Sequence, residues 1–178
     1  KKSKNKKKLV CLTAYSKPIA KILDKYCDII LVGDSVATAF YGHKDTRSIN
    51  METMINHAKS VKKVTKNSLT VFDMPHKTYR TISEAKKNSK KVIKELKFDA
   101  IKIESNGQNY NIIKKLVKLG IPVMGHIGYT PQNKKNFRVQ GIEKDHEKKL
   151  IKEAKMIERS GAFSVVLECI TSNVAKQI

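Results

Sequence analysis

Three carboxylates in this 178-residue sequence each follow a separate short apolar run, where they could act together. They are Asp34 in LVGDS, Asp73 in VFDMP and Glu104 in IKIES. Carboxylates that converge in a partly buried site repel one another unless a cation joins them. Oxygen ligands suit a hard ion, most naturally Mg²⁺ completed by water and substrate. The pattern predicts a magnesium site at Asp34, Asp73 and Glu104. The alternative is that each is a strand-end or capping residue paired with a neighbour.

Three further ionisable residues indicate proton chemistry beside that site. Lys102 in IKIES could bind an anionic substrate or stabilise an enolate, and an ion pair with Glu104 is compatible with both roles. Glu168 has apolar neighbours in VVLEC, which should raise its pKa toward the range of a general base; the alternative is a buried glutamate paired to a lysine. His126 in GHIGYTPQ either binds substrate or is a satisfied strand-end histidine. A metal, a lysine and a glutamate base predict proton abstraction next to a carbonyl.

The apolar runs that carry these residues alternate with segments of helical spacing, a pattern typical of repeated βα units. Strands are predicted at Val10–Thr13, Ile29–Val32, Leu69–Phe72, Ala100–Ile103, Val123–Gly125 and Ser164–Leu167. Apolar residues recur at helical spacing within 51–61, 85–96 and 150–157. Helix starts are predicted at Ser16 and Ser83, and helix stops at Gly120 and Gly161. Without a linker, this order predicts one α/β domain with a parallel sheet.

Two architectures fit the alternation, a doubly wound open sheet and a (β/α)8 barrel. Neither GxGxxG nor GxxxxGK[ST] occurs, and TAYSKP follows the first strand. Polar residues at nearly every strand end favour the barrel, which gathers those ends around one mouth. Lys102 and Glu104 would then point inward and Ile101 and Ile103 outward. About six βα units are visible, so the domain at 9–178 is expected to lack the last two units of a barrel.

Charge and cysteine content bear on the class of partner. The net charge is +21, but the lysines are spread over helix faces and lack interleaved aromatics, which disfavours a nucleic-acid-binding protein. The basic residues 1–8 are expected to form a flexible arm. No apolar run is long enough for a membrane helix. Three cysteines without a CxxC pair indicate reduced thiols, and a cytoplasmic protein is expected.

The segments LTAY, ILVGDS, DMP, IKIE, GHIGYTPQ, FRVQG and VLEC occur in this order from about Leu9 to the last residue. Together they resemble the ketopantoate hydroxymethyltransferase (3-methyl-2-oxobutanoate hydroxymethyltransferase) family. The resemblance implies a (β/α)8 barrel of the phosphoenolpyruvate mutase-like superfamily that forms a homo-oligomer, commonly a decamer. It also implies transfer of a hydroxymethyl group from methylenetetrahydrofolate to α-ketoisovalerate, giving ketopantoate for pantothenate synthesis.

The resemblance assigns a role to each matching polar residue. It makes Glu168 the base that takes the C3 proton. It implies that the metal ligands are Asp34, Asp73 and Glu104, the last through water, and that the substrate-binding residues are Asp34, Ser35, Asp73, Lys102 and His126.

This sequence departs from the family pattern at three places. DMPHKTYR places His76 and Lys77 near the pocket, the loop between TPQ and FRVQG is short and lacks Gly-Gly, and the last two βα units of a barrel are expected to be missing. The alternatives are therefore a Mg²⁺-dependent lyase or mutase of the same superfamily, a nonfunctional remnant, and, on net charge alone, a nucleic-acid-binding protein.

Overall fold

The computed structural model describes residues 7–133 and 136–178 and contains six parallel strands. Their order in the sheet follows the sequence, and each strand pairs with the next one along the chain. The strands are β1 (Cys11–Thr13), β2 (Ile29–Val32), β3 (Leu69–Asp73), β4 (Ala100–Glu104), β5 (Val123–Gly128) and β6 (Ser164–Glu168). The six predicted strands are therefore confirmed. The predicted arm at 1–8 lies outside the described residues except for Lys7 and Lys8.

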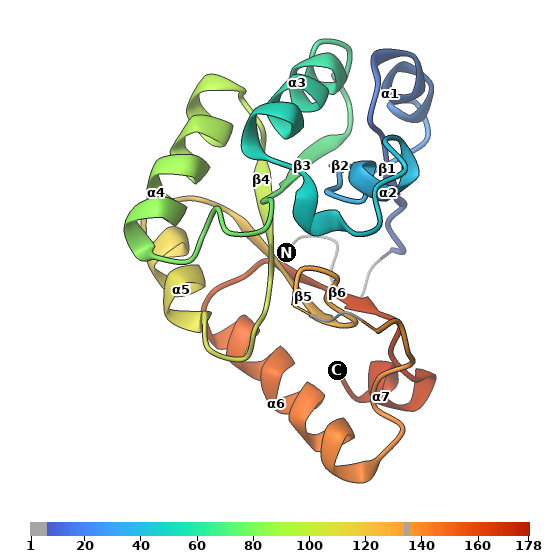
Figure 1. The fold of residues 1–178 in the computed structure, drawn as a ribbon, viewed down its shortest axis with the longest axis vertical. Coiled ribbons are helices and arrows are strands. Elements are labelled where there is room, and N and C mark those ends of the chain that lie inside the picture. Colours follow the sequence, from blue (N-terminus) through green and yellow to red (C-terminus); the bar gives the residue numbers. More distant parts are fainter. Residues whose placement is uncertain (1–6, 134–135) are drawn as a thin grey trace.

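Helices connect successive strands and surround the curved sheet (Figure 1). They are α1 (Lys17–Leu23), α2 (Val36–Ala39), α3 (Met51–Lys62), α4 (Ile82–Lys90), α5 (Tyr110–Lys118), α6 (Lys144–Arg159) and α7 (Ser172–Gln177). A 3₁₀ turn, η1 (Thr46–Ser48), precedes α3, and a π-helical turn, η2 (Lys91–Glu95), continues α4. No helix in the described part of the chain is both long and apolar enough to cross a membrane. This βα order is that of a (β/α)8 barrel and confirms the predicted fold class.

Most of the predicted helix ends agree with the structure. Ser16 is the N-cap residue of α1, and Gly120 and Gly161 end helices with φ of +76° and +90°. Positive φ at these positions is the left-handed conformation that glycine adopts without steric cost. The prediction for Ser83 is wrong, because α4 begins after Thr81, whose side chain accepts from the N–H of Glu84. Glu84 in turn accepts from the N–H of Thr81, so this reciprocal capping box fixes the start of the helix.

The two faces of the sheet pack differently. Ile101 and Ile103 of β4 belong to the large core formed with the helices, whereas Ala100 belongs to a smaller cluster with Val71 and Met124. Because side chains alternate along a strand, Lys102 and Glu104 lie on the same inner face as Ala100. All five residues of β4 are buried. The AIKIES segment therefore has the inward charges and outward isoleucines that its sequence predicts.

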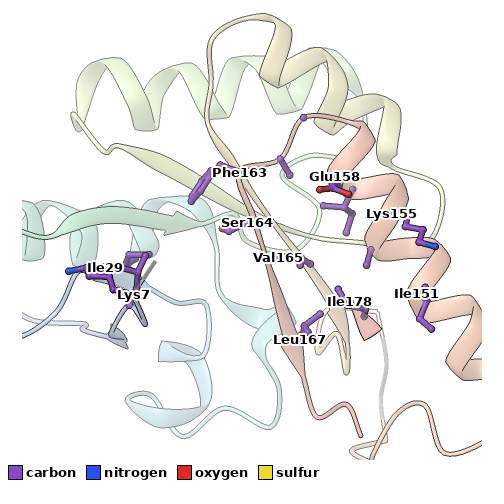
Figure 2. Close-up of a pocket in the computed structure, with 15 residues that line it drawn as sticks. Lys7, Ile29, Ile151, Lys155, Glu158, Phe163, Ser164, Val165, Leu167 and Ile178 are labelled. Carbon is purple, nitrogen blue, oxygen red and sulfur yellow. The ribbon is translucent and has the colours of Figure 1, made fainter. Parts of the chain in front are cut away.

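Strand β6 forms one edge of the sheet, and a groove of about 950 Å³ runs beside it. Figure 2 shows Val165 and Leu167 of β6 between Ile29 on one side and Ile151 of α6 on the other. The groove is mainly apolar and is lined by none of the residues predicted to be catalytic. The candidate site therefore lies elsewhere, at the carboxyl ends of the strands.

Asp24, directly after α1, joins this helix to the segment that leads into β3. Its carboxylate accepts from the backbone N–H groups of Lys66, Asn67 and Ser68 at 2.8–3.0 Å. Burial opposes ionisation, but these hydrogen bonds outweigh it and lower the pKa of Asp24. Stability from a lowered carboxyl pKa is present above the ordinary value of 3.8 and is lost as the pH falls through the folded-state pKa.

We therefore expect Asp24→Asn to lower the free energy of unfolding at pH 7 by about 1–3 kcal/mol, since N–H groups lose their acceptor. The difference from wild type should shrink when the pH falls below 3.8. Urea unfolding at pH 7 and at pH 3 measures both values. An equal difference at the two pH values would show that the charge of Asp24 contributes nothing.

Candidate active site

The parallel register aligns the predicted site residues along one edge of the sheet. Asp73 pairs with Lys102 across β3 and β4, and Glu104 pairs with His126 across β4 and β5. Glu168 ends β6 opposite Gly128. Asp34 follows β2 after a single glycine. The strand-end residues named from the sequence thus come together at the carboxyl edge, where a (β/α) barrel carries its chemistry.

Asp34, Asp73 and Lys102 form one half of the site. The Nζ of Lys102 lies 2.6 Å from Oδ2 of Asp73, and the backbone N–H of Asp34 donates to the same oxygen at 3.3 Å. Asp73 is 2% and Lys102 is 5% exposed. Lys102 therefore pairs with Asp73, in place of the ion pair with Glu104 that the sequence allowed.

Negative charge is concentrated in this buried space. Burial raises the pKa of Asp73 to about 7, and the neighbouring Asp34 adds to the rise while Lys102 opposes it. Burial also raises the pKa of Glu104 to about 9, again opposed by Lys102. For Lys102, burial favours the neutral amine, but the charges of the three carboxylates outweigh it and raise its pKa. Lys102 is therefore a fixed cation among carboxylates that would accept further positive charge.

Glu104, His126 and Glu168 form the other half. Oε2 of Glu104 accepts from the backbone N–H of Gln132 at 3.0 Å and from Nδ2 of Asn133 at 3.2 Å. Nδ1 of His126 lies 3.7 Å from Oε1 of Glu104, and Nε2 lies 3.1 Å from Oε2 of Glu168. Within residues 7–133 and 136–178, neither ring nitrogen of His126 has a hydrogen-bond partner. Burial, with the charge of Lys102, lowers the pKa of His126, so a neutral imidazole separates the two glutamates.

Glu168 differs from its predicted environment. Its side chain is 39% exposed, although apolar neighbours in VVLEC led us to expect burial. The cause is the position of β6 at the edge of the sheet, where all five residues of the strand are only partly buried. The carboxylate is accessible in this structure, and His126 lies beside it.

The carboxylates do not form a complete metal cage by themselves. Within residues 7–133 and 136–178, no three Asp, Glu, His or Cys side chains are placed to hold a metal ion together. Two buried oxygens, Oδ1 of Asp73 and Oε1 of Glu104, nevertheless have no hydrogen-bond partner in that part of the chain. Mg²⁺ usually takes one or two protein carboxylates and completes its octahedron with water and substrate. Asp34 and Asp73 fit that pattern, whereas Oε2 of Glu104 is held by its own hydrogen bonds.

Three polar residues at the site were not predicted from the sequence. Gln132 contacts Asp34, and Tyr79 contacts Gln132. Tyr15 shares a 2.7 Å hydrogen bond with Ser35, the half-buried residue that was predicted to bind the substrate carboxylate. Tyr15 in LTAY follows β1 after a single alanine, as Asp34 follows β2 after a single glycine, so the same strand-end signal could have found it. Gln132, in the GHIGYTPQ segment, and Tyr79 lie deeper in the loops after β5 and β3 and had no comparable signal.

Two of the departures from the family pattern fall in the loops that follow β3 and β5. His76 is half-buried, and burial together with Lys77 lowers its pKa. Lys77 itself is exposed and has φ of +66°. The short loop between TPQ and FRVQG includes residues 134–135, which lie outside the described residues.

Gly128 allows β5 to approach β6 at the site. Its φ is +98°, and a Cβ at this position would lie 2.2 Å from the carbonyl oxygen of Glu168. We expect Gly128→Ala to push β6 away, with a loss of stability of about 1–3 kcal/mol and a larger loss of activity. Thermal unfolding and a rate assay on the same samples test this. Gly42→Ala is the control, since it has φ of +67° but open space at the Cβ position. Equal effects of the two variants would show that the contact with Glu168 is unimportant.

Comparison with known proteins agrees with this geometry. The sequence model of the ketopantoate hydroxymethyltransferase family matches residues 1–178. The chain is 48% identical to the 3-methyl-2-oxobutanoate hydroxymethyltransferase of Pelagibacter ubique, covering 99% of this chain and 69% of that protein. It is 46% identical to the enzyme of the same name from Thermosipho africanus, covering 99% and 68%. The chain thus spans about two thirds of the length of these relatives.

Solved structures share the fold at much lower identity. A 2,3-dimethylmalate lyase of the PEP mutase/isocitrate lyase superfamily superimposes with a TM-score of 0.70 at 14% identity, over 95% of this chain and 60% of that one. A phosphonopyruvate hydrolase in complex with oxalate and Mg²⁺ gives a TM-score of 0.68 at 12% identity, over 92% and 58%. These likenesses confirm the barrel type that the sequence predicted.

Proposed function

This chain belongs to the ketopantoate hydroxymethyltransferase family, and from that premise we propose that it transfers a hydroxymethyl group from methylenetetrahydrofolate to α-ketoisovalerate. The observation that carries the proposal is the convergence of Asp73, Lys102 and Glu168 on one edge of the sheet. An enolising enzyme needs a base, an anion site and a counter-charge for the enolate at a single place. The site supplies all three from separate strands.

We propose that Glu168 removes the C3 proton of the keto acid. Its carboxylate is accessible, and the neutral His126 lies 3.1 Å from it on the inner side. His126 is buried between Glu168 and Glu104, so it would line the inner side of the pocket next to the base. The one-carbon unit would leave the folate nitrogens as their C–N bonds break, with water supplying its oxygen; the enolate would then attack this carbon to form the new C–C bond, and tetrahydrofolate would be released. This assignment keeps the predicted roles of Glu168 as base and His126 as a pocket residue.

Charge at the other half of the site would stabilise the enolate. Lys102 is buried and is held in place by Asp73. We propose that Asp34 and Asp73 hold Mg²⁺, which when bound supplies a Lewis acid for the keto and carboxylate oxygens. Glu104 would complete the metal surroundings through water, since its Oε2 is already engaged by Gln132 and Asn133. Ser35, half-buried beside Asp34, would contact the substrate carboxylate.

A Mg²⁺-dependent lyase or mutase of the same superfamily is the closest alternative. Structures of that type resemble this chain at 11–14% identity, whereas curated hydroxymethyltransferases match at 41–48%. That difference favours hydroxymethyl transfer. Nucleic-acid binding is not supported, because lysines occur on α1, α3, α4, α5 and α6 and do not gather on one element. Free thiols at Cys11, Cys27 and Cys169 support the cytoplasm as the compartment.

A direct assay tests the proposal. The full-length protein, given α-ketoisovalerate, methylenetetrahydrofolate and Mg²⁺, should form ketopantoate, which mass spectrometry detects. A lyase would instead cleave 2,3-dimethylmalate or a related hydroxy acid under the same conditions. Cleavage without ketopantoate formation would overturn the proposed function in favour of the lyase alternative.

A further inference from the structure

Gln132 connects three strand ends across the mouth of the barrel. Its Nε2 donates to Oδ2 of Asp34 at 2.8 Å and to the carbonyl oxygen of Met74 at 2.9 Å. Its backbone N–H donates to Glu104 at 3.0 Å. The residue is 3% exposed. One side chain from the loop after β5 therefore reaches both the residue after β2 and the residue after β3.

The orientation of the amide is fixed by its partners. Asp34 Oδ2 and Met74 O are both acceptors, so the NH₂ group must face them and the amide oxygen must face away. On that far side the hydroxyl of Tyr79 donates to Oε1 at 2.6 Å. Burial, with the charge of Glu104, raises the pKa of Tyr79 well above its usual value, so the hydroxyl keeps its proton. Both amide hydrogens and the amide oxygen are thus engaged.

We propose that Gln132, oriented by Tyr79, is the positioning residue that sets the Asp34 carboxylate for cation binding. The amide binds one oxygen of Asp34 and fixes the plane of the carboxylate. It also donates to the carbonyl oxygen of Met74, the neighbour of Asp73. The same amide therefore connects the segments that carry Asp34 and Asp73. Residues behind metal ligands commonly fix ligand orientation in this way. The inference rests on the proposed Mg²⁺ site at Asp34 and Asp73.

The side chain and the backbone of Gln132 contact different residues, so substitutions can remove the side-chain contacts alone. The contact with Glu104 comes from the backbone N–H, so it survives any substitution except proline. Gln132→Met keeps a similar volume but loses the contacts with Asp34, Met74 and Tyr79. Tyr79→Phe keeps Gln132 in place and removes only the hydroxyl that fixes the amide. The first variant therefore removes the amide that contacts Asp34, and the second removes the hydroxyl that orients this amide.

Binding of Mn²⁺ to the full-length protein, followed by the electron paramagnetic resonance of free Mn²⁺, tests the inference. Gln132→Met should raise the Kd for Mn²⁺ about 10- to 100-fold. Tyr79→Phe should raise it by a smaller factor, since the amide can still reach Asp34. Thr65→Val is the control, because it removes a buried hydroxyl that donates to Val61 at the opposite end of the strands. Its Kd should equal that of wild type even if its melting temperature falls.

The outcomes separate this inference from the proposed function. A folded Gln132→Met protein with the wild-type Kd would overturn the role of Gln132 and leave the metal site intact. If Gln132→Met does not fold, a wild-type Kd for Mn²⁺ in Tyr79→Phe would overturn the proposal that Tyr79 orients Gln132 for this role. Failure of the wild-type protein to bind Mn²⁺ would overturn both. A loss of keto-acid enolisation that recovers at high Mg²⁺ in Gln132→Met, unlike the loss in Glu168→Gln, would support the positioning role.

Discussion

Glu168→Gln should lower the rate of proton abstraction from α-ketoisovalerate by about 10²- to 10⁴-fold, the contribution of a positioned general base. The amide keeps the size and the exposed position of the side chain at the end of β6 but cannot accept the C3 proton. Binding of the keto acid should stay within a few-fold of wild type, because the proposed anion and metal contacts come from Lys102, Asp34 and Asp73. Single-turnover kinetics and keto-acid titration measure the two effects separately.

Glu95→Gln is a matched control for this experiment. Glu95 is exposed and ends η2, in the segment that leads into the amino end of β4, on the side opposite the site. The same chemical change there should leave the rate unaltered. Wild-type turnover in Glu168→Gln would remove Glu168 from the base role and direct attention to His126.

Asp73→Asn should raise the Mg²⁺ concentration for half-maximal rate by tenfold or more, because a proposed metal ligand loses its charge. It should also destabilise the fold. Lys102 is 2.6 Å from Asp73 in a site from which water is largely excluded, and breaking a buried ion pair costs about 3–5 kcal/mol. The Mg²⁺ dependence of the rate and urea unfolding of the metal-free protein measure the two effects.

A double-mutant cycle with Lys102→Met distinguishes the effect on Mg²⁺ dependence from the effect on stability. Without the lysine, Asp73→Asn no longer leaves a buried cation unpaired, so this substitution should lower the free energy of unfolding by less in that background. The shift in Mg²⁺ dependence should persist. An unchanged Mg²⁺ titration in Asp73→Asn would contradict the assignment of Asp73 as a ligand, whatever the change in stability.

The strands and the inner face were predictable because both follow from local pattern. In IKIES, alternation alone places Lys102 and Glu104 on one face, and their strand-end position places them at the barrel mouth. The partner of Lys102 was not predictable, since parallel register sets Asp73 beside it and register depends on the whole sheet. The exposure of Glu168 was not predictable either. An apolar sequence context indicates burial only where neighbouring strands flank the residue on both sides, and β6 is paired on one side in this structure.

Contacts between loops were the hardest to predict. The start of α4 was misplaced by two residues, because Ser83, the second residue of the helix, carries the same kind of hydroxyl as the capping residue Thr81. Gln132 and Tyr79 lie 53 positions apart, and nothing local indicates that they meet. Such contacts are set by how the loops fold over the strand ends.

The measurement that tests the central claim most directly is proton NMR of α-ketoisovalerate in D₂O with the purified full-length protein, with and without Mg²⁺. Loss of the C3 proton signal requires only the keto acid, the cation site and the base, so it is independent of the folate donor. The site at Asp34, Asp73, Lys102 and Glu168 predicts Mg²⁺-dependent exchange that Glu168→Gln slows by about 10²- to 10⁴-fold. Absence of exchange with Mg²⁺ present, or exchange at the wild-type rate in Glu168→Gln, would contradict it.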